Sequence, residues 1–366
     1  MLSWLFVERF FMKKKDRIFI EIIIGLSLIT AAVYFFVGIE KELIWSAGRV
    51  DIDSGSRVVM GTFARVIAVA ADSNTAKQCI EAAFAEITKI DKLMSDYKSD
   101  SEISELNRDG FVRAVKVSKS TYEVLQRSVE FGKLTGGAFD VTVGPLVDLW
   151  HLAGAANVVP SEAELQQACS KVGYDKLILD ANEMSVRFAV EGMRIDLGAI
   201  AKGYAIDKAV EAMQKGRAIG GMVEIGGDIR CFGAPPAGKE RWRIGLQDSR
   251  RIDEEISEGK VLLVLELTDA GVATSGDYQR FVVIEGKKYS HIIDTKTGCT
   301  SDELTSVTII SQNATDADAL ATAVSVMGQQ KGLELIESLP ETEAILITSA
   351  PEYKLIKTTG AEKYIE

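Results

Sequence analysis

One long apolar stretch near the N-terminus constrains this chain more than any other feature. The 18 residues from Ile22 to Ile39 contain no charged side chain, and a basic cluster between Lys13 and Arg17 lies just before them. As a helix they would span about 27 Å, close to the thickness of a bilayer's hydrocarbon core. Their apolar side chains would cover every face of that helix, which favours a membrane span over a buried core helix.

The basic cluster sets the expected orientation of this span. Positive residues that flank a span stay in the cytoplasm, so residues 1–17 form a cytoplasmic basic segment and residues 18–40 a transmembrane signal anchor. Residues 41–57 then form a linker on the opposite side, because they are mostly small or polar. A cleaved signal peptide is the alternative, but residues 45–47 lack the small residue expected three places before a cut. An uncleaved anchor is therefore the prediction.

The overall charge and the scarce histidines limit what residues 58–366 can bind. The chain has 53 acidic and 42 basic residues, a formal charge of −11, which disfavours a general basic surface for nucleic acid. Only 2 histidines occur, so a multi-histidine metal site cannot form and a metal would take oxygen ligands. The 4 cysteines lie far apart without a CxxC pair, which leaves their redox state open.

Helices and strands are mixed without a regular βαβ pattern, which predicts an α+β fold. Apolar spacing indicates helices over residues 74–97, 199–214 and 316–327, the first capped by Asp72 or Ser73. Capping boxes at Ser120–Glu123 and Ser161–Glu164 predict two further helix starts. Runs of β-branched and apolar residues predict strands, which cover residues 63–70, 261–267, 281–284 and 305–311.

Three common nucleotide and metal motifs are absent. Residues 198–203 begin like a phosphate loop but lack the Lys and the Ser or Thr that would follow. Residues 316–327 begin like a calcium loop but lack Gly at the sixth position and Glu at the twelfth. No GxGxxG follows a predicted strand, so a Rossmann dinucleotide site has no support.

Seven separated polar segments remain: Met60–Thr62, Met94–Tyr97, Gly136–Asp140, Asp196–Gly203, Gly226–Asp228, Ser290–Asp294 and Ala317–Thr322. In this order they resemble the ApbE family of FAD-dependent flavin transferases, over about residues 58 to 350. The resemblance implies an ApbE-like α+β domain of mixed sheets and helices at residues 58–366. It also implies FAD as substrate, Mg²⁺ as cofactor, and transfer of FMN to a Thr or Ser hydroxyl of an acceptor protein with release of AMP.

Together with the anchor, the resemblance implies a single-pass protein of the bacterial inner membrane with its catalytic domain on the periplasmic side. The acceptors would be exported redox proteins, such as a subunit of a membrane redox complex. Many relatives carry a lipid-modified cysteine at the end of their signal. Here the first cysteine is Cys79, so the apolar helix would have to hold the enzyme at the membrane.

Asp318 and Thr322 are the predicted side-chain ligands of the metal. They lie four residues apart on a predicted helix, so both oxygens fall on one face and can share a hard cation. Without the resemblance, a helix cap plus a buried threonine would be the more common explanation of such a pair. The resemblance places magnesium there and adds the backbone carbonyl of Ala199.

The resemblance also implies a set of positions that contact FAD: Met60, Tyr97, Ala138, Phe139, Asp140, Asp196, Lys202 and Ile293. A thioether and an aromatic ring can pack against isoalloxazine at Met60 and Tyr97. A turn at Gly136–Gly137 can bring backbone groups and one carboxylate to the ligand. Lys202 can oppose phosphate charge, although a lone lysine is more often a solvated charge.

His291 and Asp294 are the candidates for removing the acceptor's proton. The acceptor hydroxyl must lose a proton, and a histidine is the usual base for that step. His291 could instead only orient a ligand, and Asp294 would then take the proton. The family has proline directly after this segment, where this chain has Thr295, which predicts a looser turn.

Two other functions stay open for the same residues. The domain could bind or scavenge FAD without transferring it, or it could act as a pyrophosphatase that splits FAD into FMN and AMP. Thr274, which stands among small residues, raises self-modification as a remote third alternative. Neither the acceptor protein nor the oligomeric state follows from the sequence.

Overall fold

The computed structural model describes residues 48–249, 261–276, 281–349 and 351–366. Residues 50–366 form one compact unit. Within the described residues, no helix combines the length and the apolar character that a membrane span needs. The predicted anchor, residues 18–40, lies outside the described residues.

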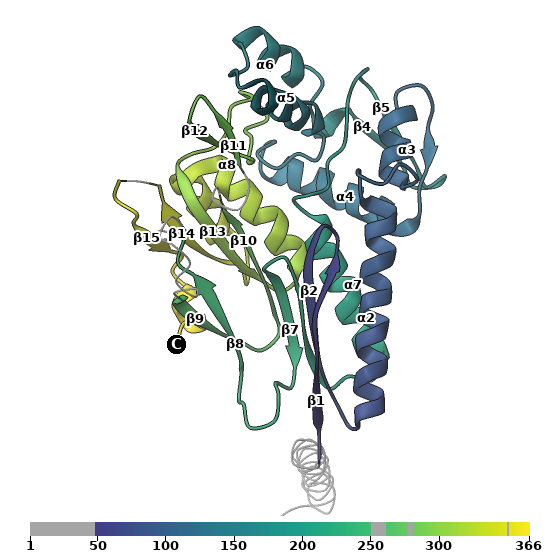
Figure 1. The fold of residues 1–366 in the computed structure, drawn as a ribbon, viewed down its shortest axis with the longest axis vertical. Coiled ribbons are helices and arrows are strands. Elements are labelled where there is room, and N and C mark those ends of the chain that lie inside the picture. The colour runs from purple at the N-terminus through teal and green to yellow at the C-terminus, as the bar shows by residue number, and fades with distance from the viewer. Residues whose placement is uncertain (1–47, 250–260, 277–280, 350) are drawn as a thin grey trace, which may run out of the picture. The chain divides into compact units, whose positions relative to one another are not determined.

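An eight-stranded antiparallel sheet is the centre of this unit (Figure 1). Its strands, in spatial order, are β1 (Val50–Val59), β2 (Thr62–Ala70), β6 (Gly220–Ile225), β7 (Asp228–Gly233), β10 (Ala270–Gly276), β13 (Leu304–Ser311), β14 (Glu343–Thr348) and β15 (Leu355–Lys357). Because side chains alternate along a strand, neighbouring residues enter different cores: Val272 packs in one and Ala273 in the other.

Three helices cover one face of the sheet and a hairpin covers the other. The helices are α2 (Ser73–Met94), α7 (Ala201–Lys215) and α8 (Ala314–Ser338). The hairpin consists of β8 (Trp242–Gln247) and β9 (Val261–Leu267), whose apolar side chains meet the second core. Strand β13 is buried along its whole length because both of its faces are covered.

The remaining elements gather at one end of the sheet, the upper end in Figure 1. They are α3 (Glu102–Asp109), β3 (Val115–Lys116), α4 (Lys119–Leu134), α5 (Gly144–Ala156), α6 (Glu162–Cys169), β4 (Leu177–Asp180), β5 (Ser185–Phe188), β11 (Phe281–Ile284) and β12 (Lys287–Ser290), with a short 3-10 turn at Tyr174–Lys176. A second 3-10 turn, Ala361–Tyr364, lies instead against β14 and β9. Strands β3, β5 and β4 form a small sheet. Helices α5 and α6 share an apolar core with the β11–β12 hairpin.

Most predicted elements are confirmed, as is the α+β fold. Asp72 caps α2 by accepting from the N–H of Thr75, and Ser161 and Glu164 form the predicted capping box of α6. The prediction for the first capping box was wrong. Helix α4 begins one residue before Ser120 and is capped by Ser118, while Glu123 instead accepts from the Tyr204 hydroxyl.

The predicted linker ends earlier than residue 57. Strand β1 begins at Val50 and pairs with β2, with a bulge between Asp53 and Ser56. The strand lies at the edge of the sheet and exposes most of its side chains, so it needs few apolar residues. That composition made it resemble a linker.

All four cysteines are free thiols in the structure. Cys79 and Cys231 are buried, Cys169 is half-buried and Cys299 is exposed. Burial raises the pKa of the Cys79 thiol, which suits a small core residue better than a reactive one.

Candidate functional site

Backbone and side-chain hydrogen bonds connect several of the seven segments, which are far apart in the sequence. Gly226 donates its N–H to the Phe63 carbonyl at 2.9 Å, which brings the Gly226–Asp228 turn against the β1–β2 turn that holds Met60. Arg194 pairs with Asp96 at 3.2 Å and so ties the Tyr97 segment to the chain leading into Asp196. Residues far apart in sequence therefore meet at one end of the sheet.

Two further hydrogen bonds connect residues 137–141 to Asp196 and to Thr295. Asp196 donates its N–H to the Val141 carbonyl at 2.8 Å. The Thr295 hydroxyl donates to the Gly137 carbonyl at 2.7 Å and links the predicted FAD segment at 136–140 to the segment that holds His291. Proline, which the family has at the position of Thr295, could not make this hydrogen bond.

The most polar part of the site is a cluster of the half-buried Lys202 with the buried Asp228 and Asp318, called the carboxylate–lysine cluster below. Lys202 lies in the first turn of α7, and its ammonium donates to Asp228 and, at 3.2 Å, to Asp318. Both aspartates expose only 3% of their surface. Gly203 donates its N–H to the second oxygen of Asp318 at 3.1 Å, so that carboxylate has a fixed orientation.

The charges of this cluster do not cancel. Burial raises the pKa of Asp228 to about 6; the Lys202 ammonium opposes this rise and the Asp318 charge adds to it. Burial alone would lower the pKa of Lys202, but the two carboxylates outweigh it and hold that pKa above its ordinary value. With both carboxylates ionised, one ammonium leaves one net negative charge in a buried place. Such a charge is costly unless a cation offsets it.

Two contacts between α7 and α8 fix the position of Asp318. Asp207 of α7 accepts from the backbone N–H groups of Ala314 at 3.0 Å and Thr315 at 2.9 Å, and so caps the start of α8. One turn earlier the helices approach so closely that a Cβ on Gly203 would lie 2.3 Å from the Ala314 carbonyl oxygen. Only glycine allows this approach, and it aims the Gly203 N–H at Asp318.

The oxygens around Asp318 fit a hard divalent cation. Thr322 lies one turn further along the same face of α8, and its hydroxyl is 3.3 Å from that of Ser275 on β10. Because Gly203 donates to Asp318, its N–H does not engage the Ala199 carbonyl, four residues back and just before the helix. A carboxylate, two hydroxyls and a carbonyl are ligands that Mg²⁺ accepts. In the described part of the chain, no three His, Cys, Asp or Glu side chains converge as a metal site, so the metal would depend on these mixed oxygens.

The predicted FAD-contacting residues differ in what they can offer. Tyr97 exposes 85% of its surface, so its ring is accessible to a ligand. Met60 is half-buried in the β1–β2 turn. Phe139 is buried with its ring edge-on to Phe131 at 5.7 Å. Asp140 accepts from the N–H and hydroxyl of Thr142 and from the backbone N–H of Tyr174, in the 3-10 turn that follows α6. In the Gly136–Asp140 segment, only the backbone and Ala138 therefore remain available to contact a ligand.

The two candidate bases lie in different settings. His291 is exposed directly after β12. The Asp294 carboxylate accepts from the Lys296 N–H at 2.9 Å and from the Thr297 hydroxyl at 3.1 Å, so it closes its own turn. Ile293 is buried in the core shared by α5 and α6 and points away from solvent. Asp196 similarly accepts from the Gly198 N–H at 2.7 Å, which shapes the approach to α7.

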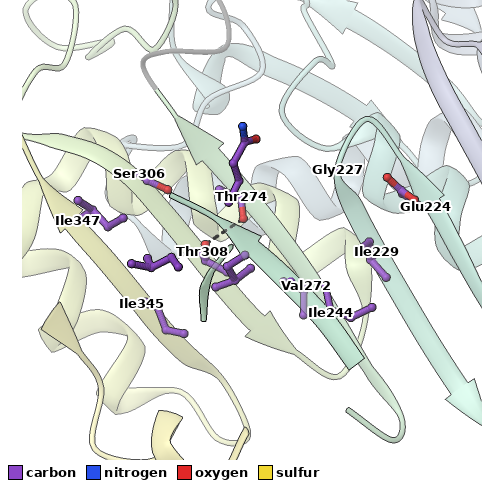
Figure 2. Close-up of a pocket in the computed structure, with 14 residues that line it drawn as sticks. Glu224, Gly227, Ile229, Ile244, Val272, Thr274, Ser306, Thr308, Ile345 and Ile347 are labelled. Atoms are coloured by element: carbon purple, nitrogen blue, oxygen red, sulfur yellow. Dashed lines mark hydrogen bonds between the residues drawn. The ribbon is translucent and has the colours of Figure 1, made fainter. Parts of the chain in front are cut away.

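A cleft of about 180 Å³ lies on the opposite face of the sheet (Figure 2). It lies between the β8–β9 hairpin and the central strands, and Thr274 and Thr308 share a hydrogen bond of 2.9 Å in its floor. Ser275, the next residue of β10, points to the other face, toward Thr322. The cleft is lined by Thr274 and by Gly227 of the Gly226–Asp228 segment, but by none of the predicted metal-binding, FAD-contacting or base residues.

Comparison with known proteins decides the family. The sequence profile of the ApbE family matches residues 60–346, most of the chain. The chain belongs to the ApbE family. The resemblance drawn from the seven segments is thereby confirmed.

Individual members of the ApbE family align with most of this chain, and a solved structure shares its fold. The FAD:protein FMN transferase of Treponema pallidum is 31% identical over 341 residues, which cover 87% of this chain and 92% of that protein. The Vibrio cholerae enzyme of the same name is 35% identical over 275 residues, 73% of this chain and 78% of that protein. The crystal structure of the ApbE protein from Thermotoga maritima has a TM-score of 0.76 at 31% identity and covers 87% of this chain and 99% of its own.

The sequence analysis placed Asp228 in one of the seven segments but assigned no role to it, and it assigned no role to Ser275 either. Asp228 follows Gly226–Gly227 after an apolar strand, a pattern typical of a two-residue hairpin turn that places the next side chain at a strand start. That signal was available in the sequence. The partner of Asp228, a lysine 26 residues earlier, could not be identified without the structure.

Proposed function

We propose that this protein transfers FMN from FAD to a Thr or Ser hydroxyl of an acceptor protein and releases AMP. The observation that carries the proposal is the carboxylate–lysine cluster, a buried site with net negative charge beside hydroxyl and carbonyl oxygens, within an ApbE-family fold. Relatives that span most of the chain bear the name FAD:protein FMN transferase.

In the proposed reaction the acceptor oxygen attacks the phosphorus of the FMN half of FAD. A new oxygen–phosphorus bond forms, the bond from that phosphorus to the bridging oxygen breaks, and AMP leaves with the bridging oxygen. The hydroxyl proton passes to a base on the enzyme. The products are a phosphoester-linked flavin on the acceptor and free AMP.

The chain's own residues hold the diphosphate for this step. Asp318, Thr322 and the Ala199 carbonyl would bind Mg²⁺, which when bound supplies positive charge against the diphosphate oxygens. Lys202 adds a fixed ammonium at the start of α7. The open ring of Tyr97 and the thioether of Met60 offer apolar surface for the flavin.

Mass spectrometry of an acceptor domain tests this function. The full-length chain, FAD and Mg²⁺ should add the mass of FMN less one water to a Thr or Ser, with one AMP released per adduct. A pure FAD-binding protein would leave FAD intact, and a pyrophosphatase would release free FMN with no adduct. Either result with several acceptor domains would contradict the proposal.

His291 is the better candidate base, because Asp294 already closes its own turn. Replacing His291 by Ala should lower the transfer rate about 10²- to 10⁴-fold, the usual contribution of a general base. Asp294→Asn keeps an oxygen that accepts from Lys296, so it should retain most of the rate. The rates are compared by counting adducts over time. A larger loss for Asp294→Asn than for His291→Ala would reverse the assignment.

The N-terminal segment is proposed to anchor the enzyme in the bacterial inner membrane, with residues 50–366 on the periplasmic side. The uncharged run at 22–39 and the preceding basic cluster support this. Alkaline carbonate should leave the protein in the membrane pellet, and protease added to spheroplasts should degrade the domain. Recovery of the chain in the soluble cytosolic fraction would contradict the anchor.

A further inference from the structure

We infer that Asp228 is a positioning residue for the metal site: it holds the Lys202 ammonium so that Asp318 remains available to bind a divalent cation. The inference rests on the proposed function, because it assigns a role toward the metal of that site. Asp228 would touch neither the metal nor the flavin. It acts through Lys202.

The backbone places Asp228 where it can do this. Residues Gly226 and Gly227 have φ values of 61° and 95°, as a two-residue hairpin turn between β6 and β7 requires. Asp228 is the first residue after this turn and pairs with Ile225. Its second oxygen accepts from the backbone N–H of Thr274 on β10 at 3.3 Å. The carboxylate is thus fixed from two strands.

Lys202 has two acceptors, and the two contacts are unequal. Its ammonium donates to Asp228 and also lies 3.2 Å from one oxygen of Asp318, whose other oxygen is occupied by the Gly203 N–H. The side chain of Lys202 is fixed between two acidic groups that are almost fully buried. Because Asp228 takes the closer contact, Asp318 is only partly neutralised by the lysine.

Removing the charge of Asp228 changes this balance. In Asp228→Asn the ammonium would have one carboxylate left, and a full ion pair would form with Asp318. A cation would then have to displace the lysine and would meet no net negative charge. Outer-shell partners of metal ligands change metal affinity by about 10- to 100-fold when they are removed.

Binding of Mn²⁺ to the full-length chain tests the inference without measuring transfer. Free Mn²⁺ is followed by electron paramagnetic resonance at saturating FAD. Asp228→Asn should raise the dissociation constant of Mn²⁺ about 10-fold or more, as expected for an outer-shell partner. An unchanged constant in a variant with unchanged circular dichroism would overturn the inference. Absence of Mn²⁺ binding by the unaltered chain would overturn it as well.

A double-mutant cycle with Lys202→Gln shows whether Asp228 acts through the lysine. Lys202→Gln alone should bind Mn²⁺ at least as tightly as the unaltered chain, because the competing ammonium is gone. In that background Asp228→Asn should cost much less than its roughly 10-fold effect alone. Equal costs in both backgrounds would contradict the inference. If Asp228→Asn does not fold, a 10-fold weaker affinity in Lys202→Gln alone would overturn it.

These outcomes separate the inference from the proposed function. A shifted Mn²⁺ affinity with no FMN adduct in the unaltered chain would leave the inference standing and remove the transfer reaction. If Asp228→Asn forms adducts at the normal rate and with the same metal dependence, the transfer reaction stands and the inference about Asp228 is wrong. In the transfer assay, the inference predicts that extra Mg²⁺ restores much of the rate of Asp228→Asn.

Discussion

Asp318→Asn lowers the rate of FMN transfer by at least about 10³-fold, which corresponds to about 4 kcal/mol of lost transition-state stabilisation. The substitution keeps the volume of the side chain and an oxygen that can accept from Gly203. It removes one charge, so Lys202 and Asp228 become a neutral pair with no charge left for a cation. The rate is measured as adducts formed per minute at fixed FAD and Mg²⁺.

Asp316→Asn is the matched control for this prediction. Asp316 lies two residues earlier on α8 and accepts from the Arg127 guanidinium at 2.9 Å, away from the carboxylate–lysine cluster. We expect its transfer rate to stay within about threefold of the unaltered chain, because a partly exposed ion pair contributes little. Equal losses in the two variants would show that the Asp318 effect is not specific to the metal site.

Gly203→Ala disrupts both the packing of α7 against α8 and the metal site. The added methyl group would lie 2.3 Å from the Ala314 carbonyl oxygen, a backbone atom that cannot rotate away. The helices must separate, at a cost of about 1–3 kcal/mol or more, and the melting temperature should fall by about 2 °C or more. Transfer should fall with it, because the Gly203 N–H then leaves Asp318. Calorimetry and the adduct assay measure the two effects.

Gly154→Ala on α5 is the corresponding control. Its new methyl group would lie 3.1 Å from Val282, a side-chain neighbour that can shift by the small amount required. Alanine is the better helix former by up to about 1 kcal/mol, which offsets the tighter contact. The melting temperature should therefore change little. A similar loss of stability in both variants would contradict the argument from close helix approach.

Local signals in the sequence predicted the elements well where the signal itself makes the structure. Asp72 and Ser161 cap their helices because a short polar side chain directly reaches the free N–H groups of the first turn. Strand β13 was predictable because its sequence is rich in β-branched and apolar residues, which favour strands. The seven segments were predictable as a set because family resemblance depends on residue types in order.

The parts that could not be predicted depend on contacts between distant residues. Residues Ser120–Glu123 have the sequence of a capping box, yet Ser118 caps α4, and Glu123 accepts instead from the Tyr204 hydroxyl on α7. Asp140 looked like a ligand carboxylate, but it accepts hydrogen bonds from Thr142 and from the backbone N–H of the distant Tyr174. Lys202 looked like a phosphate contact alone, and only the fold shows the two carboxylates around it.

Anomalous diffraction from crystals of the protein with FAD and Mn²⁺ locates the proposed metal site. We expect one manganese peak in contact with the Asp318 carboxylate, the Thr322 hydroxyl and the Ala199 carbonyl, and touching the diphosphate of FAD. A peak elsewhere, or a diphosphate bound far from Asp318, would contradict it.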